Sequence, residues 1–198
     1  AELLHALGFN VYFPENHAAM LGAARVAGDL IPLANAEGFS PDICSYLTSD
    51  IGSYLKGQTP LQKMGMTGPP PADVLVFNTN QCRDVKDWFQ WYARKWNVPC
   101  VGIHTPRAIG DVDEPLIENV AVQTEALIEP LEQVAGVRFD IDRLREIVDL
   151  SRQCTVLWKE VLETATHVPA PLTFFDATIH MALAVVLRGT QEAVDYYR

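Results

Sequence analysis

The sequence has few cysteines, few positive charges and no long apolar run, and each shortage argues against a class of protein. Its four cysteines, Cys44, Cys82, Cys100 and Cys154, lack C-x-x-C spacing and are too few for a disulfide scaffold, which favours reduced thiols. The 15 lysines and arginines stand against 25 acidic residues, and a net charge of −10 disfavours nucleic acid and anionic membranes as partners. No apolar stretch approaches the roughly 20 residues that a membrane span needs. We therefore expect a soluble, cytoplasmic protein.

The motifs of several enzyme classes are missing as well. The chain contains no GxxxxGK[ST], HExxH, GxSxG or GxGxxG segment, so P-loop nucleotide hydrolysis, zincin proteolysis and serine-esterase chemistry lose their usual signatures. Any ATP hydrolysis that the function needs would then take place in another protein. With 198 residues, 48% of them hydrophobic, the chain is nevertheless able to bury a core.

Both ends of the sequence look interrupted. Ala1 lies inside a running amphipathic pattern that continues through residues 2–8, and Arg198 follows residues 193–197 without a stop signal. We therefore expect a chain that is truncated at both ends.

The N-terminal part combines a predicted strand with predicted helices. Residues 11–14 are β-branched and aromatic and end in a proline, which is typical of a short strand. Residues 16–37 predict one or two helices, and Pro32 is expected to bend or divide the helical stretch. A cap residue, a proline and an acid at 40–42 then open a helix that is expected to end at Gly57 and to carry Cys44 in its first turn.

The clearest pattern is a β-α-β unit. Residues 72–77 form a near-continuous apolar run, as in a strand that is covered on both faces of a parallel sheet. Residues 84–96 follow with a helical stripe of aromatic residues expected in the core, and residues 98–103 form a second strand of the buried type. Cys82 precedes the helix and His104 follows the second strand. Ligands of parallel sheets bind at the carboxyl ends of the strands, so both residues are expected at that edge.

The second half of the sequence is helical. Residues 114–134 and 141–166 have long helical patterns, and a further helix is expected from about residue 175 to residue 187. We therefore predict the α/β class. A Rossmann-like lobe with a parallel sheet and flanking helices is expected over residues 1–136. A helical segment over residues 137–198 is expected to lead into a truncated second lobe.

Cys44 and Cys82 are the candidates for chemistry. Each is predicted at a helix N-terminus, where the helix dipole and free amides stabilise a thiolate, and such thiolates serve as nucleophiles or iron–sulfur ligands. On spacing alone, the role of small buried residues is favoured for both, because free cysteine is among the most buried residue types. Cys100, inside an apolar strand, and Cys154, inside a helix stripe, fit core positions better.

Several segments closely resemble the 2-hydroxyacyl-CoA dehydratase and benzoyl-CoA reductase family. They are residues 2–9 (ELLHALGF), 42–46 (DICSY) and 71–82 (PADVLVFNTNQC), together with Trp88-Phe89. Residues 169–176, 187–190 and 193–198 look most like the large subunits of ATP-dependent benzoyl-CoA reductases. The resemblance spans essentially the whole chain.

This resemblance implies a 4Fe-4S cluster held by three cysteines. Cys44 matches the first ligand and Cys82 the second, whereas the third is expected beyond Arg198 and neither Cys100 nor Cys154 matches it. The resemblance also implies a homologous cluster-bearing subunit as partner, a separate ATP-hydrolysing iron–sulfur activator and an acyl-CoA substrate.

On this resemblance, the leading expectation is an oxidoreductase subunit that passes low-potential single electrons from the cluster to benzoyl-CoA or a similar aromatic acyl-CoA and dearomatises its ring. The nearest alternative is a lyase subunit, in which a ketyl-type radical of a 2-hydroxyacyl-CoA expels its hydroxyl group. A further alternative is a non-catalytic partner subunit that completes an interface.

Glu2 and His17 are candidate proton donors. Glu2 lies in the Glu-Leu-Leu stretch that matches the family, and His17 follows the first predicted strand, so either could face a cleft at a strand end. A solvated or structural role is the alternative for each, because neither has a partner visible in the sequence.

Overall fold

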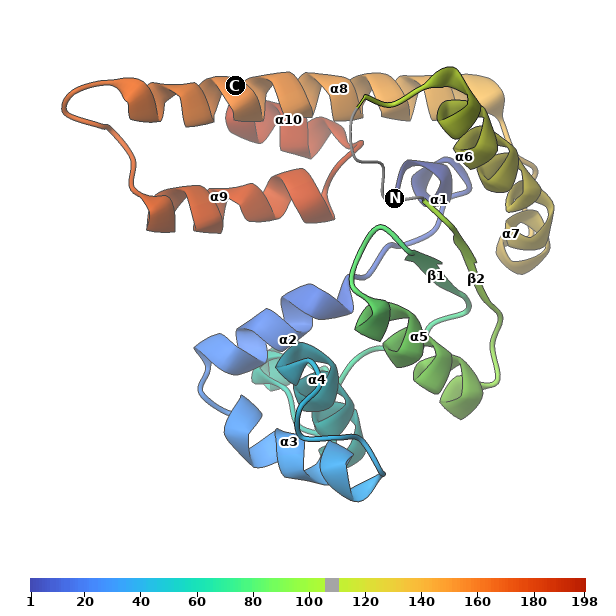
Figure 1. The fold of residues 1–198 in the computed structure, drawn as a ribbon, viewed down its shortest axis with the longest axis vertical. Helices are drawn as coiled ribbons and strands as arrows, with labels where there is room; N and C mark the ends of the chain where they lie inside the picture. The colour runs from blue at the N-terminus through green and yellow to red at the C-terminus, as the bar shows by residue number, and fades with distance from the viewer. Residues whose placement is uncertain (106–110) are drawn as a thin grey trace. The chain divides into compact units, whose positions relative to one another are not determined.

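The structure, a computed structural model, describes residues 1–105 and 111–198 (Figure 1). In chain order its elements are α1 (Glu2–Ala6), α2 (Pro14–Ala23), α3 (Ala27–Ala36), α4 (Ser45–Lys56), the 3-10 helix η1 (Pro60–Met64), β1 (Leu75–Asn78), α5 (Arg83–Trp96), β2 (Cys100–Ile103), α6 (Glu114–Ala126), α7 (Ile128–Ala135), α8 (Ile141–Glu163), the 3-10 helix η2 (Thr164–Thr166), α9 (Phe174–Val186) and α10 (Gln191–Tyr197). Helices flank a small parallel sheet, which confirms the predicted α/β class.

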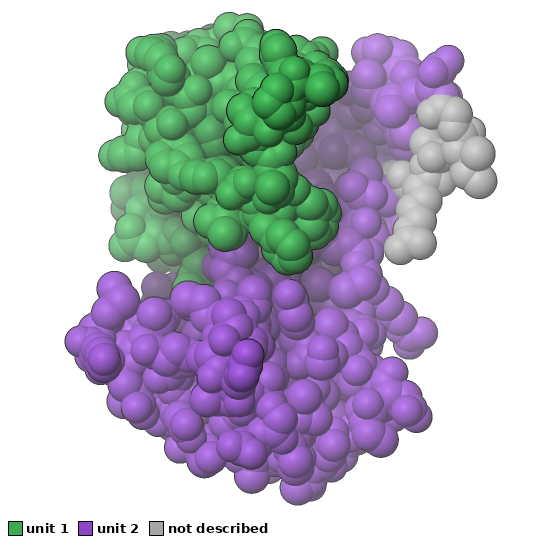
Figure 2. Space-filling model, turned by 90° about the vertical axis from the view of Figure 1, so that its left-hand side faces the viewer, with its two compact units in different colours: residues 1–12, 128–198 green, residues 13–127 purple. Residues whose placement is uncertain are grey.

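The chain divides into two compact units (Figure 2). Unit 1 consists of residues 1–12 and 128–198, and unit 2 consists of residues 13–127. The sequence predicts a boundary after residue 136 and groups the first residues with the α/β lobe. The contacts divide the chain differently, because α1 packs against the long helix α8 of the C-terminal part.

Unit 2 contains the predicted β-α-β unit. Strands β1 and β2 pair in parallel, with Leu75 opposite Cys100 and Asn78 opposite Ile103, and α5 connects them. Both strands begin two to three residues later than the sequence predicts. Their carboxyl ends nevertheless lie side by side, because the strands are parallel and Asn78 is paired with Ile103.

The aromatic stripe of α5 lies in the core of unit 2, as predicted. Trp88 and Tyr92 are each 1% exposed, and Phe89 is also buried. Tyr92 stacks on Trp96 with ring centroids 4.3 Å apart, and Tyr54 of α4 meets Tyr92 edge to face at 5.6 Å. Offset and edge-to-face pairs of this kind add to the stabilisation from burial alone.

Helix α4 begins later than predicted and ends where predicted. Residues 41–43 form a turn, so Cys44 is the N-cap of α4 and does not lie in its first turn. Gly57 closes the helix with φ of 64°, a left-handed conformation that glycine adopts without steric cost. Most of the helix is buried, because α2 and α3 pack against it.

The predicted strand at residues 11–14 is wrong. Phe13 is extended but caps α2, and Pro14 takes the first helical position, where its missing N–H costs nothing. The helical stretch that follows is divided at residues 24–26, where Arg25 has φ of 58°, whereas Pro32 lies inside α3.

The predicted helix over residues 114–134 is interrupted at Leu127. Pro130 lies in the first turn of α7, and in a continuous helix its ring would clash with the carbonyl four residues earlier, at Ala126. The chain therefore forms two shorter helices, α6 and α7.

Unit 1 is built on α8, the longest helix. A small core of buried residues on α8, α9 and α10 holds these helices together: Cys154, Ala184, Ala193, Val194 and Tyr197. Across the described ranges, every helix is too short or too polar to span a bilayer.

Candidate functional site

Cys44 and Cys82 occupy the same position on two different helices. Cys44 is the N-cap of α4 and is half-buried, and Cys82 is the N-cap of α5 and is exposed. The prediction that both lie at helix N-termini is thus confirmed, with Cys44 one position earlier than expected. The first-turn amides and the helix dipole favour negative charge at both positions.

A hydrogen bond ties the two helix N-termini together. The backbone N–H of Cys44 donates to Oδ2 of Asp84 at 3.2 Å, and Asp84 is the second residue after Cys82. The N-termini of α4 and α5, each capped by a cysteine, are therefore linked through the first turn of α5. Asp84 was not a sequence candidate, because an acid in a first turn is common and its partner lies far away in the chain.

The carboxyl edge of the sheet is polar beside Cys82. The turn between β1 and α5 carries Thr79, whose hydroxyl hydrogen-bonds Nδ1 of His104 at 2.8 Å and accepts the Thr105 N–H at 3.1 Å. Gln123 of α6 makes two hydrogen bonds to the His104 backbone. Its Oε1 accepts from the His104 N–H at 2.7 Å, and its Nε2 donates to the His104 carbonyl oxygen at 2.9 Å. His104 is exposed, so the edge predicted for Cys82 and His104 presents both residues to solvent.

The donor set suits part of an iron–sulfur site. Cys44 and Cys82 offer two sulfur ligands at adjoining helix N-termini, and thiolate is the preferred ligand of iron–sulfur clusters. Within residues 1–105 and 111–198, no group of three or more His, Cys, Asp or Glu side chains could hold a metal ion. The described residues thus fit two of the three ligands that the family resemblance implies.

The other two cysteines are placed differently. Cys154 is fully buried in the core of unit 1, and Cys100 is half-buried on β2. Burial raises the pKa of both thiols, which disfavours the thiolate form. Cys154 thus occupies the core position that the sequence predicts, whereas Cys100 is only partly buried against the core of unit 2.

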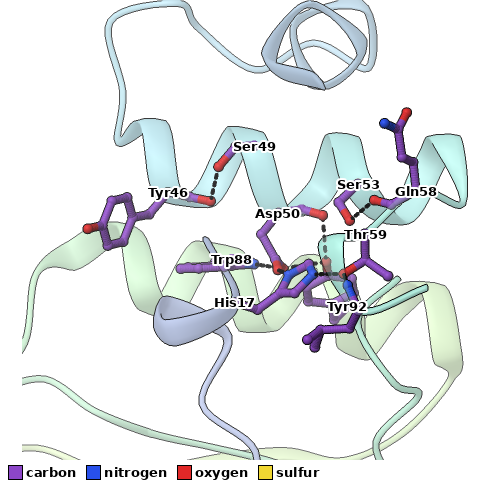
Figure 3. A network of polar contacts seen from close by, with 10 residues as sticks. His17, Tyr46, Ser49, Asp50, Ser53, Gln58, Thr59, Trp88 and Tyr92 are labelled. Atoms are coloured by element: carbon purple, nitrogen blue, oxygen red, sulfur yellow. Dashed lines mark hydrogen bonds and ion pairs between the residues drawn. The ribbon is translucent and has the colours of Figure 1, made fainter. Parts of the chain in front are cut away.

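His17 lies inside unit 2, in a buried polar network (Figure 3). Its Nδ1 is 2.5 Å from Oδ1 of Asp50, and its Nε2 is 2.8 Å from the hydroxyl of Thr59. Both ring nitrogens are engaged and the side chain is 0% exposed. This position favours the structural alternative over proton donation to a substrate, although the proton-donor role itself stays a prediction.

Asp50 is the centre of that network, and nothing in the sequence marks it as such. Its Oδ2 accepts hydrogen bonds from Nε1 of Trp88 at 3.1 Å and from the hydroxyl of Tyr92 at 2.6 Å. With His17 on the other oxygen, this fully buried carboxylate has three partners from α2 and α5. A single acid within a helix carries no local signal, since its partners lie more than thirty residues away in either direction.

Glu2 lies in unit 1 and is held as a carboxylate. Its Oε1 accepts hydrogen bonds from the Ser151 hydroxyl at 2.8 Å and from Nε of Arg188 at 3.1 Å. Burial raises its pKa, but hydrogen bonds from its own backbone N–H, Ser151 and Arg188 are among the interactions that lower the pKa to about 2. A carboxyl that is ionised at neutral pH is a poor proton donor, so the contacts favour the structural alternative here too.

Known proteins resemble the chain over its whole length. It is 31% identical over 198 residues to the (R)-phenyllactyl-CoA dehydratase alpha subunit of Clostridium sporogenes, covering 100% of this chain and 47% of that one. It is 29% identical to the (R)-2-hydroxyisocaproyl-CoA dehydratase alpha subunit of Clostridioides difficile, covering 100% of this chain and 48% of that one. It is 32% identical to a benzoyl-CoA reductase subunit of Thauera aromatica, covering 93% of this chain and 43% of that one.

The chain spans about half the length of these curated relatives. The sequence model of one family, described as 2-hydroxyglutaryl-CoA dehydratase, D-component, matches residues 1–198. The chain therefore belongs to the 2-hydroxyglutaryl-CoA dehydratase D-component family, whose members include subunits of acyl-CoA dehydratases and of benzoyl-CoA reductase.

Proposed function

We propose that the protein is an iron–sulfur subunit that acts on an acyl-CoA thioester by single-electron chemistry. The observation that carries this proposal is the pair Cys44 and Cys82, which cap adjoining helices beside the carboxyl edge of a parallel sheet. Family membership supplies the substrate class. When bound, a 4Fe-4S cluster supplies single electrons at low potential.

In this proposal each cysteine has a defined task. Cys44, which is half-buried, anchors the cluster to α4, and Cys82, which is exposed, anchors it to α5 on the side that faces solvent. The N-terminal dipoles of both helices stabilise the thiolates and offset the negative charge that they bring. A third ligand comes from outside the described residues.

For the reaction, we propose reduction of an aromatic acyl-CoA, such as benzoyl-CoA. The ring takes up one electron, then protons and a second electron, and becomes a cyclic diene. Two observations support this choice: residues 169–176, 187–190 and 193–198 resemble the large subunits of benzoyl-CoA reductases, and the chain is 32% identical to the benzoyl-CoA reductase subunit of Thauera aromatica.

The second candidate is dehydration of a 2-hydroxyacyl-CoA. Matches to two dehydratase alpha subunits over 100% of the chain favour it. In this reaction the electron that enters the thioester is recovered after the hydroxyl group leaves, so no net reduction occurs. Both candidates therefore need the same pair of thiolates.

We also propose that the protein works with other subunits in the cytoplasm. A homologous subunit would complete the enzyme, since the relatives' names describe each of them as one subunit of a larger enzyme. The family resemblance implies a separate ATP-hydrolysing iron–sulfur activator, which would supply the electrons.

The test uses the full-length protein with its partner subunit and activator, under anaerobic conditions with ATP and a strong reductant. Consumption of benzoyl-CoA and of a 2-hydroxyacyl-CoA is measured for the unaltered protein, Cys82→Ala and the control Cys100→Ala. The proposal expects Cys82→Ala to abolish turnover while Cys100→Ala retains it. Unaltered turnover in Cys82→Ala would leave only a non-catalytic partner role, and the substrate that is consumed decides between the two reactions.

A further inference from the structure

Helices α4 and α5 are tied together at two depths. At their N-termini, the Cys44 N–H donates to Asp84. Further in, Nε1 of Trp88 donates to Oδ2 of Asp50 at 3.1 Å. Asp50 and Trp88 each lie six residues beyond the cysteine that caps their helix, which is about 9 Å along the helix axis. The second tie therefore joins the two helices at equal distances from their cysteines.

The chemistry of Asp50 makes this second tie demanding. Its side chain is 0% exposed, and a carboxylate removed from water is tolerated only while hydrogen bonds replace its hydration. An indole N–H can only donate, so Oδ2 must accept from Trp88, and Tyr92 donates to the same oxygen. The two donors stand one helical turn apart on α5, so they fix both the distance and the rotation of α5 relative to Asp50.

His17 completes the requirement from the other side. It binds Oδ1 of Asp50 and the hydroxyl of Thr59, so α2 and the chain after α4 hold the carboxylate in one orientation (Figure 3). The tie is thus a network rather than one contact, and such networks permit few alternative packings.

We propose that Asp50 is a positioning residue for Cys44 and Cys82. Its carboxylate fixes α4 against α5, so that the two sulfurs keep one separation before any cluster binds. This inference rests on the proposed function in one respect, that the two cysteines act together. A pair of ligands held in place loses less conformational entropy on binding than two that move independently.

Three variants separate positioning from mere folding. Asp50→Leu removes the acceptor at similar size. Asp50→Asn keeps an oxygen for Trp88 and Tyr92, and its amide N–H can donate to His17 once the imidazole changes tautomer. Asp87→Leu places the same leucine on the exposed face of α5 and serves as the matched control.

The measurement is cysteine cross-linking of the full-length protein without cluster, using bis-maleimides of increasing length. Mass spectrometry then quantifies the cross-linked Cys44 and Cys82 peptides. We expect one preferred length for the unaltered protein, Asp50→Asn and Asp87→Leu. For Asp50→Leu we expect the yield of cross-linked peptide to fall about tenfold at that length. We also expect cross-links with longer reagents, because the helices lose their common acceptor. An unchanged length profile in Asp50→Leu would overturn the inference.

Trp88→Phe covers the case in which Asp50→Leu fails to fold. It removes one indole N–H and keeps an aromatic ring, so we expect the cross-link yield to fall about threefold at the preferred length. An unchanged profile for this variant would equally contradict the inference. Iron content is measured separately and distinguishes the two proposals. If the cross-linking profile depends on Asp50 but the protein binds no iron, the positioning role is supported. The proposed function is then rejected.

Discussion

The two compact units stabilise their helices by different means. In unit 2 a buried carboxylate, Asp50, is surrounded by hydrogen-bond donors and aromatic rings. In unit 1 the buried core is mainly apolar, with leucine side chains and Trp158 packed against it, and the Glu2–Arg188 ion pair lies at the border with solvent. Helix α9 of unit 1 also exposes Phe174 (80%) and Phe175 (75%). The residues proposed to bind the cluster are in the unit with the buried polar centre.

This difference has a physical consequence. Apolar contacts tolerate small shifts, because a neighbouring packing of similar volume costs little. A buried hydrogen-bond network tolerates few shifts, since each displaced donor or acceptor loses its partner without regaining water. Unit 2 is therefore suited to hold ligands at fixed positions.

The largest expected effect is on the buried centre of unit 2. Asp50→Leu leaves His17, Trp88 and Tyr92 without their shared acceptor, and removing one member of a buried charged network costs about 4 kcal/mol. Urea unfolding followed by tryptophan fluorescence measures this loss of unfolding free energy. The matched variant Asp87→Leu, on the exposed face of α5, should stay within about 0.5 kcal/mol of the unaltered protein. A loss below about 1 kcal/mol for Asp50→Leu would mean that the network is not what stabilises unit 2.

A somewhat smaller effect is expected where two helices of unit 2 meet. A Cβ on Gly52 would lie 2.1 Å from the Leu30 carbonyl oxygen, so Gly52→Ala forces α3 and α4 apart and costs about 3 kcal/mol. A Cβ on Gly22 of α2 would instead lie in open space. Gly22→Ala should therefore stabilise the folded protein by about 0.5 to 1 kcal/mol through helix propensity. Equal effects of the two substitutions in thermal unfolding would contradict the packing described for unit 2.

The smallest effect is expected at the edge of unit 1. Glu2→Gln removes one charge beside Arg188, which is 40% exposed, so the expected loss at pH 7 is about 1 kcal/mol or less. The pKa of Glu2 falls from 4.5 to about 2 on folding, so its contribution is complete above the unfolded value and disappears as the pH falls towards the folded value. Unfolding free energies of Glu2→Gln and the unaltered protein should therefore converge between pH 4.5 and pH 2. A constant Glu2→Gln difference over this range would argue against the ion pair.

Local patterns were sufficient to predict the β-α-β unit. The apolar run before Asn78 and the aromatic stripe of α5 are local hydrophobic patterns. Such patterns indicate which residues of a strand or helix are buried. Cys82 could be placed at a helix N-terminus for the same reason. The strand predicted at residues 11–14 failed because β-branched and aromatic composition says nothing about a neighbouring strand to pair with.

The contacts that organise the site could not be predicted from the sequence. Asp50 lies 33 residues after His17 and 38 before Trp88, and nothing local marks it as buried. The bond from the Cys44 N–H to Asp84 is likewise a product of tertiary packing. Periodicity identifies the faces of helices, but which polar groups meet across them depends on how the helices pack.

The central claim is that Cys44 and Cys82 bind one cluster together, and iron and acid-labile sulfide content tests it most directly. The measurement compares the anaerobically purified full-length protein with Cys44→Ser, Cys82→Ser and the control Cys100→Ser. The account predicts that either Cys44→Ser or Cys82→Ser loses most of its iron and sulfide, while Cys100→Ser keeps the unaltered content. Full iron and sulfide in both Cys44→Ser and Cys82→Ser would contradict the account.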